Sequence, residues 1–220
     1  MNMINIVTSF FIPKFRNDLN TEREAELKQT LDKNLESPLI EKVHLFVDDD
    51  LALEYITQLN SPKIIVISVG KQPTYTDLFE YATEKLAGKF CMSTNSDIYL
   101  RRFPDKLLKY LDNNDTVFAL SRYEHDFSCP MINNYCGSHD SFIFKSPLKN
   151  TDFLPNINHL QNVWGSESVL MYELAKCNIK IYNPCRQVII VHLHKSDLRN
   201  AGRIKINHTR KLRVKPSILK

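Results

Sequence analysis

Short apolar segments alternate with amphipathic segments along the first 120 residues, and this order constrains the fold more than any other feature. Strands are predicted at 4–11, 43–47, 63–69, 89–94 and 116–120. Helices are predicted between them, the first after a capping box at Thr21 and Glu24 and the third after a second capping signal at Thr74 and Asp77. Helices are also expected at 51–59 and 104–111. Such alternation is typical of an α/β fold with a mostly parallel sheet covered on both faces.

After residue 120 the pattern becomes irregular. A loop-rich stretch runs to residue 155 with one strand at 141–145, and it is followed by a helix at 167–177 and a strand at 187–193. Eight Lys and Arg residues and no acidic residue occupy 199–220, whereas the other residues carry a net charge of −4. We therefore predict one domain at 1–199 and a basic segment at 200–220, which either meets an anionic partner or is a solvated terminus.

Composition narrows the class of protein. No apolar run approaches the roughly 18–20 residues that span a bilayer, and the N-terminus lacks the basic start of a secretory signal. The five cysteines are odd in number and form no C-x-x-C pair, which argues against a disulfide framework or a cysteine zinc site. A reducing cytoplasm is the expected location. The sequence does not indicate an oligomeric state.

Only five glycines are present, and two common phosphate-binding loops are missing. No G-x-G-x-x-G follows the first strand, and no G-x-x-x-x-G-K-[ST] occurs in the chain. A nucleotide site in this protein would therefore need a cation, or Lys and Arg side chains, to neutralise the phosphates.

The best candidate for a metal site lies at the end of the fourth predicted strand. Asn95, Ser96 and Asp97 follow it directly, at the sheet edge where ligands bind in open α/β sheets. A carboxylate there can hold Mg²⁺ or Mn²⁺, although a turn or helix cap is an equally ordinary role for these residues. His192 and His194 end the last strand on one face, and one of them could complete the metal shell, which would favour Mn²⁺.

Other polar residues could serve a ligand. Lys195 and Arg199 follow the histidines and could clamp phosphate oxygens. Glu167, behind the predicted N-cap Ser166, and Asp140 are candidate general bases, with helix capping and an exposed turn as the alternatives.

The ends of the first two strands offer further candidates. Asp48 follows the second strand, where an acidic side chain commonly binds a ribose, although a solvated turn is equally expected. Thr8 and Phe10 end the first strand beside it.

The order of these segments resembles that of the GT-A fold glycosyltransferases, particularly small single-domain enzymes of large algal DNA viruses and some bacteria. The shared segments are R-x-x-E at 23–26, the acidic residue at 48, K-x-x-T-Y at 71–75, N-S-D-I-Y at 95–99, L-S-R-Y-E at 120–124, D-S-F-I-F at 140–144, G-x-E-S at 165–168 and N-P-x…H-x-H-x-S…R at 183–199. The resemblance spans residues 4–199. It departs from the pattern at Asn95, where D-x-D is usual, and at Ser168, where Asn or Asp is usual.

The resemblance implies sugar transfer from a nucleoside-diphosphate sugar, with UDP favoured, to a hydroxyl of a glycan or glycoprotein. It implies Mn²⁺ or Mg²⁺ held by Asp97 and His194, with His192 as the alternative ligand, and Glu167 or Asp140 as the base if the reaction inverts the anomeric centre. The nucleotide-sugar contacts that it implies are Thr8, Phe10, Asp48, Lys71, Tyr75, Asn95, Ser96, Asp97, Lys195 and Arg199.

Two other functions compete with this hypothesis. A sugar nucleotidyltransferase would also bind a metal–nucleotide complex on an α/β sheet, but a basic glycine-rich loop after the first strand is lacking. A nucleic-acid-binding module could use the basic segment, but the rest of the chain is acidic and carries no recognisable reader motif. A nucleic-acid partner is therefore not expected.

Overall fold

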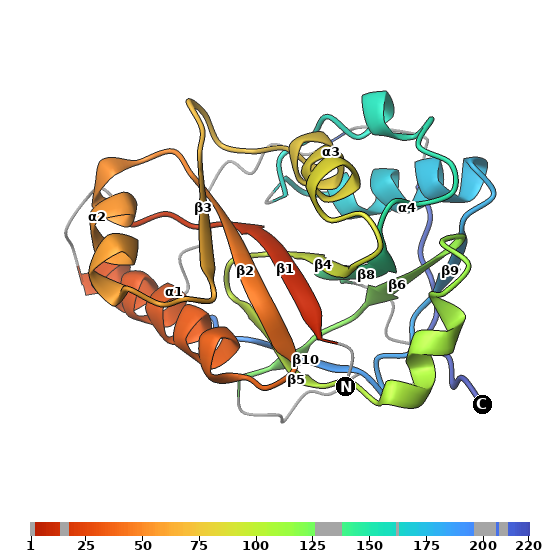
Figure 1. Cartoon of the computed structure of the whole chain (residues 1–220), viewed down its shortest axis with the longest axis horizontal. Coiled ribbons are helices and arrows are strands. Elements are labelled where there is room, and N and C mark those ends of the chain that lie inside the picture. The colour runs from red at the N-terminus through yellow and green to blue at the C-terminus, as the bar shows by residue number, and fades with distance from the viewer. Residues whose placement is uncertain (1–2, 14–17, 126–137, 162, 196–205, 207–210) are drawn as a thin grey trace.

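A seven-stranded sheet forms the centre of the molecule (Figure 1). The computed structural model describes residues 3–13, 18–125, 138–161, 163–195, 206 and 211–220. The sheet has the order β3-β2-β1-β4-β8-β6-β9, and its strands are β1 (Ile4–Ser9), β2 (Ile40–Val47), β3 (Ile64–Ser68), β4 (Phe90–Thr94), β6 (Thr116–Leu120), β8 (Ser141–Lys145) and β9 (Lys180–Tyr182). Only β8 is reversed, since it pairs antiparallel with both β4 and β6. The predicted mostly parallel α/β sheet is confirmed.

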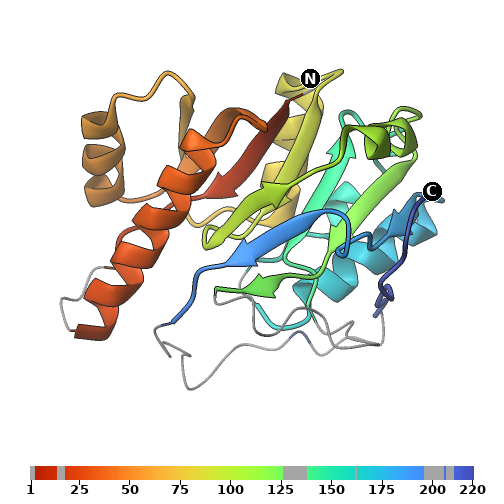
Figure 2. The ribbon, with the colours of Figure 1, turned by 90° about the horizontal axis from the view of Figure 1, so that it is seen from below.

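A second sheet of three short strands has the order β5-β10-β7. It consists of β5 (Ile98–Arg102), β7 (Tyr123–Glu124) and β10 (Ile189–His192). Strand β10 pairs antiparallel with β5 and parallel with β7, so it joins segments that are far apart in the sequence. Figure 2 shows this small sheet lying over one face of the large one, beside helix α1.

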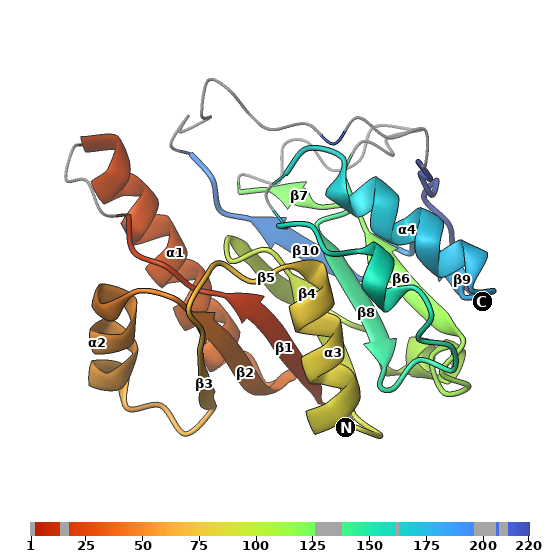
Figure 3. The ribbon, with the colours of Figure 1, turned by 90° about the horizontal axis from the view of Figure 1, so that it is seen from above.

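Side-chain alternation along the strands divides the core into two layers. Helices α1 (Asp18–Glu36) and α2 (Asp50–Leu59) and strand β5 pack on one face of the large sheet, against residues such as Val43 and Leu45. Helices α3 (Tyr75–Lys85) and α4 (Ser166–Lys176) cover the other face, against Phe46 and its neighbours (Figure 3). Because successive strand residues point to opposite faces, a strand covered on both faces buries nearly all of its side chains, as β1 does. Its polar Asn5 and Thr8 are buried as well, and their side chains are hydrogen-bonded to Glu41 and to the Thr94 carbonyl.

Several predicted elements are confirmed and two predicted caps are wrong. Strands β6 and β8 have the predicted bounds, and Thr74 and Asp77 form the predicted capping box of α3. Helix α1 already begins at Asp18, so Thr21 lies inside the helix and does not cap it. Gly165, at φ 95°, is the N-cap of α4, and Ser166 is its first residue. The Ser166 hydroxyl donates to the carbonyl of Val163 at 2.7 Å instead.

Three short strands were not predicted from the sequence, namely β5, β7 and β9. The helix predicted at 104–111 is the 3₁₀ helix η1 (Asp105–Tyr110), and a second 3₁₀ helix, η2 (Leu154–Asn156), precedes α4. Strands of two to five residues carry too few side chains to show an alternating pattern. Their positions are set by pairing with distant strands.

The end of the chain packs against the domain. Leu219 is 8% exposed and belongs to the core, and the carbonyl of Val214 accepts a hydrogen bond from the Asn183 amide at 3.1 Å. None of the helices that the structure describes is long and apolar enough to cross a membrane. Cys91, Cys177 and Cys185 are free thiols, while the other two cysteines fall outside the described residues.

Candidate metal and catalytic site

Strand pairing in the small sheet brings Asp97 and the two histidines together. Asp97 lies in the turn between β4 and β5, and His192 is the last residue of β10. In the antiparallel pairing of β10 with β5, His192 is opposite Ile98, and the backbone N–H of Leu193 donates to the Asp97 carbonyl at 2.9 Å. The register of two strands about 90 residues apart in the chain therefore fixes the geometry of this site.

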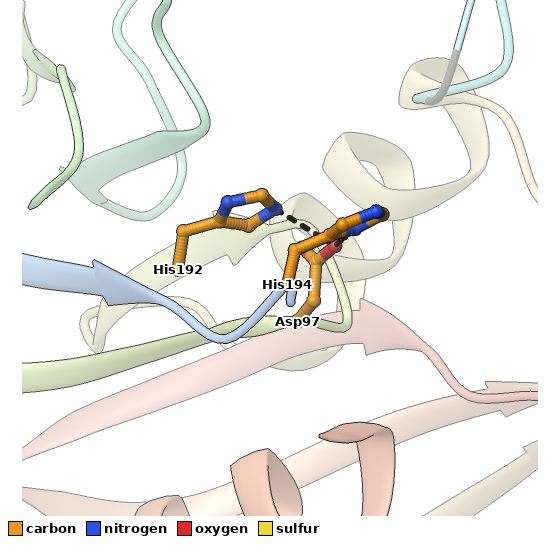
Figure 4. A group of neighbouring side chains, drawn as sticks. All are labelled: Asp97, His192 and His194. Atoms are coloured by element: carbon orange, nitrogen blue, oxygen red, sulfur yellow. Dashed lines mark hydrogen bonds and ion pairs between the residues drawn. The ribbon is translucent and has the colours of Figure 1, made fainter. Parts of the chain in front are cut away.

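The three side chains point toward one another, as Figure 4 shows, and we call them the Asp97 cluster. Nε2 of His192 lies 3.1 Å from Oδ2 of Asp97, and Nδ1 of His194 lies 3.6 Å from the same oxygen. One ligand atom from each residue lies within 4.8 Å of the others. Asp97 is 7% exposed, so the cluster is shielded from solvent.

Arg23 of helix α1 contacts both Asp97 and His194. Its Nη2 donates to Oδ2 of Asp97 at 2.6 Å, and its Nη1 lies 2.9 Å from Nδ1 of His194. Because a guanidinium only donates, this second contact requires a lone pair on Nδ1. Glu26, one turn further along α1, accepts from Nη1 of Arg23 at 3.1 Å.

Charges set the protonation of the cluster. Burial alone would raise the pKa of Asp97, but His192, His194 and Arg23 hold it well below its usual range. Burial would lower the pKa of His192, yet the carboxylates of Asp97 and Glu124 raise it to about 9. Asp97 is therefore an anion, and His192 carries a proton that a bound cation would have to replace.

The donor set fits a divalent cation. Oδ1 of Asp97 is buried and has no hydrogen-bond partner within the described parts of the chain, so it keeps a free coordinating position. On His194 the lone pair is on Nδ1, which lies 3.6 Å from Oδ2 of Asp97 and would have to exchange Arg23 for the cation. One carboxylate and two imidazoles suit Mn²⁺ better than Mg²⁺, which prefers oxygen ligands. The two histidines are both in reach, so the sequence-based preference for His194 over His192 stays a prediction.

A second group of acidic side chains lies beside the cluster. Asp140 immediately precedes β8, and its Oδ1 accepts from Nη1 of Arg122 at 2.9 Å and faces the Asn95 amide nitrogen at 3.5 Å. Glu167 lies in the first turn of α4, where burial and the charge of Asp140 raise its pKa to about 8. The buried Tyr75 hydroxyl has a pKa raised by burial and by the same two carboxyl groups. We call Asp140, Glu167 and Tyr75 the acidic pocket.

Arg122 joins the two groups. Its Nη1 contacts Asp140, and its Nε donates to Oε1 of Glu124 at 3.0 Å. Oε2 of Glu124 in turn lies 3.1 Å from Nδ1 of His192. His192 and Arg122 lower the pKa of Glu124 to about 2.

The predicted nucleotide contacts of the first half of the chain are spread over several environments. Thr8 is buried, and its hydroxyl donates to the Thr94 carbonyl at 2.7 Å. Phe10 is buried and stacks on Tyr55. Asp48 and Lys71 are exposed at the carboxyl ends of β2 and β3.

Tyr75 and the remaining predicted contacts lie nearer the Asp97 cluster. Tyr75 packs edge to face on Phe142 inside the acidic pocket. Ser96 is half-buried in the turn beside Asp97. The backbone N–H of Lys195 donates to Oε1 of Glu26, which places this exposed lysine beside α1. Arg199 lies outside the described residues.

An open groove of about 620 Å³ runs along α1, and its lining includes Glu26 and Lys195, which neighbour Arg23 and His194, but none of the three residues of the Asp97 cluster. Tyr55 and Leu193 contribute its apolar surface. A volume of this size is in the range that holds small-molecule ligands.

Four charged residues of the site were not selected from the sequence as functional residues: Arg23, Glu26, Arg122 and Glu124. All four fall inside the R-x-x-E and L-S-R-Y-E segments that carry the resemblance. Their position inside these segments was the sequence feature that could have identified them as site residues. Alone, each looks like a solvated side chain.

Comparison with known proteins identifies the fold. No protein-family model matches the chain, and no curated protein matches it in sequence. Residues 1–349 of TarS from S. aureus superpose with a TM-score of 0.52 and 12% identity, over 88% of this chain and 59% of that one. The mannosyltransferase PcManGT from Pyrobaculum calidifontis, solved with GDP-Man and Mn²⁺, gives 0.53 and 11%, over 91% and 58%.

The chain thus spans about three fifths of these two solved chains, and 37% of a longer solved chain of TarS. At such identities the likeness concerns the fold, and together with the sheet topology it places this chain among proteins of GT-A architecture.

Proposed function

We propose that this protein is a glycosyltransferase that moves a sugar from a nucleoside-diphosphate sugar to an acceptor hydroxyl. The observation that carries the proposal is the Asp97 cluster at the carboxyl ends of the sheet strands, directly beside the acidic pocket. A divalent cation held there would stabilise the negative charge that develops on the departing diphosphate. The GT-A fold and the resemblance of the motif order support the same class.

Asp97, His192 and His194 would hold the cation, and Mn²⁺ is the ion that this donor set favours. Lys195, which is exposed and lines the groove with Glu26, would contact a phosphate oxygen. Asp48 would bind the nucleoside, since it is exposed at the carboxyl end of β2. We favour a UDP-sugar as the donor on the motif resemblance.

Glu167 is the proposed base for an inverting transfer. It lies in the acidic pocket with Asp140, and its raised pKa of about 8 matches that of a group which accepts and releases a proton near neutral pH. Asp140, held by Arg122, would bind the acceptor hydroxyl. Trp164, which is 58% exposed two residues before α4, offers a flat apolar face to a glycan or glycoprotein acceptor.

A donor-hydrolysis assay tests the proposal without knowledge of the acceptor. The protein is incubated with UDP-, GDP- and CDP-sugars, each with Mn²⁺ or with EDTA, and free nucleoside diphosphate is measured. We expect release from one nucleotide class in Mn²⁺ and background release in EDTA. Background release from all three classes under both conditions, confirmed at high protein concentration, would contradict the proposal.

A further inference from the structure

Glu124 has a place in the site that neither the sequence nor the proposed reaction assigns to it. It ends strand β7, which pairs in parallel with β10 so that Glu124 is the register partner of His192. Its Oε2 lies 3.1 Å from Nδ1 of His192, while Nε2 of the same ring lies 3.1 Å from Oδ2 of Asp97. The imidazole therefore lies between two carboxylates, with one nitrogen directed at each.

The two nitrogens of this ring have different tasks in such an arrangement. A hydrogen bond from Nδ1–H to a carboxylate fixes the tautomer and the ring orientation, and it leaves Nε2 as the ligating atom. Glu124 is itself held, because Nε of Arg122 donates to its Oε1 at 3.0 Å. Each oxygen of the Glu124 carboxylate thus has a hydrogen-bond partner.

His194 lacks this support. Its Nδ1 faces Nη1 of Arg23 at 2.9 Å, and its Nε2 is buried without a hydrogen-bond partner among the described residues. The two histidines stack with ring centroids 5.1 Å apart but have different neighbours. A substitution of Glu124 should therefore affect cation binding by the Asp97 cluster through His192 and not through His194.

We propose that Glu124 is a positioning residue, which holds the His192 imidazole with Nε2 directed at the cation site beside Asp97. This inference rests on the proposed metal site. In this arrangement a carboxylate on β7 supports a metal-binding histidine on β10. The pairing of the two strands therefore helps to fix the geometry of the metal site.

The test is Mn²⁺ binding by the full-length protein, measured by calorimetry in the absence of any nucleotide. Glu124→Ala should weaken Mn²⁺ binding by about 10- to 100-fold, the range found for partners that support metal-ligating histidines. Glu124→Gln should lose less, because its amide oxygen can still accept the Nδ1–H bond and the side chain keeps its size. Glu41→Gln is the matched control, since Glu41 is also a hydrogen-bonded glutamate but lies on β2 with Lys89 and Asn5 as partners.

A double-mutant cycle separates positioning from general structural support. In a His192→Ala background, Glu124→Ala should have almost no further effect on Mn²⁺ affinity, because the ring that it orients is gone. In a His194→Ala background the full loss should persist. An equal loss in both backgrounds would overturn the positioning role.

The outcomes also separate this inference from the metal site itself. If the wild-type protein does not bind Mn²⁺, or binds it equally well after Asp97→Ala, the metal site is wrong and the inference falls with it. If Asp97→Ala abolishes binding while Glu124→Ala binds as tightly as the wild type, the metal site stands and only the inference is overturned.

Discussion

The Asp97 cluster and the acidic pocket lie on either side of Arg122, yet the pKa values of their buried carboxyl groups are shifted in opposite directions. Asp97 is surrounded by Arg23, His192 and His194, and its pKa is well below the usual range. Glu167 is surrounded by Asp140 and Tyr75, and its pKa is raised to about 8. Both groups are desolvated, so the difference comes from the charges of the neighbours.

This contrast assigns different chemistry to the two regions. The Asp97 carboxylate stays ionised among cationic and imidazole groups, so it can bind a metal ion. Binding requires that Arg23 moves off the carboxylate and that His192 loses its proton. A carboxyl group that titrates near neutral pH can exchange a proton with a substrate. Substitutions in the two regions should therefore have different effects on donor binding and on transfer.

The largest effect is expected at the Asp97 cluster. Asp97→Ala should weaken Mn²⁺-dependent binding of the donor by at least about 100-fold, because the variant loses the only carboxylate of the donor set. Calorimetry with the preferred nucleotide-sugar measures this, with the exposed Asp105→Ala as the control. Unchanged Mn²⁺-dependent affinity would place the metal elsewhere.

A change in the acidic pocket should have the opposite signature. Glu167→Gln should slow transfer by about 10²- to 10⁴-fold while the affinity for the donor stays within about twofold, because only the proton acceptor is lost. Steady-state kinetics and donor titration of the same preparation separate the two effects, and the exposed Glu80→Gln serves as the control. Normal turnover would exclude Glu167 as the base and leave Asp140 as the candidate.

The pH dependence of the reaction tests the protonation state assigned to Glu167. If Glu167 acts as the base, kcat/KM should rise with pH and level off above about 8, where this carboxyl is ionised. The same group affects stability. Its folded pKa lies above its ordinary value of 4.5, so the folded state binds more protons between pH 4.5 and 8, and the free energy of unfolding falls as pH rises through that interval.

Glu167→Gln should remove this stability loss. Between pH 5 and pH 8, the variant should gain stability relative to the wild type, by on the order of 3 kcal/mol. Urea unfolding at four pH values in this interval measures the difference. Parallel stability curves for the two proteins would contradict the raised pKa.

The smallest effect is expected at Asp48, which is proposed to bind the nucleoside of the donor. Asp48→Ala should weaken nucleotide binding by about 3- to 10-fold even without metal, as expected for the loss of one hydrogen bond on an exposed surface. Asp50→Ala, two residues further on and also exposed, is the matched control. If both variants bind the nucleotide as the wild type does, the nucleoside does not contact this segment.

The two halves of the fold differ in how much the sequence reveals. Strands β1, β2 and β4 include the mainly apolar segments that the residue pattern predicted as strands, and the Thr74 capping box marks the start of α3. Strands β5 and β7 are short and polar at one end, and they exist because β10 pairs with both. Local patterns therefore predicted the scaffold, whereas the small sheet depends on long-range pairing.

The same reasoning explains what was predicted of the site. Asp97 and the two histidines were selected because they follow strands, and strand ends meet at one edge of a sheet. Arg23 and Glu124 carry no such signal, because a charge on a helix or in a short strand is usually solvated. Only the packing of α1 beside β5 and the pairing of β7 with β10 make them part of the site.

We expect the Asp97 cluster to bind a divalent cation together with a nucleotide-sugar. The most direct test is calorimetric titration of the wild-type protein with UDP-, GDP- and CDP-sugars, each with and without Mn²⁺. We expect one nucleotide class to bind, and this binding to be strongly weakened when Mn²⁺ is withheld. Absence of binding to all three classes, or binding that is indifferent to Mn²⁺, would contradict this expectation.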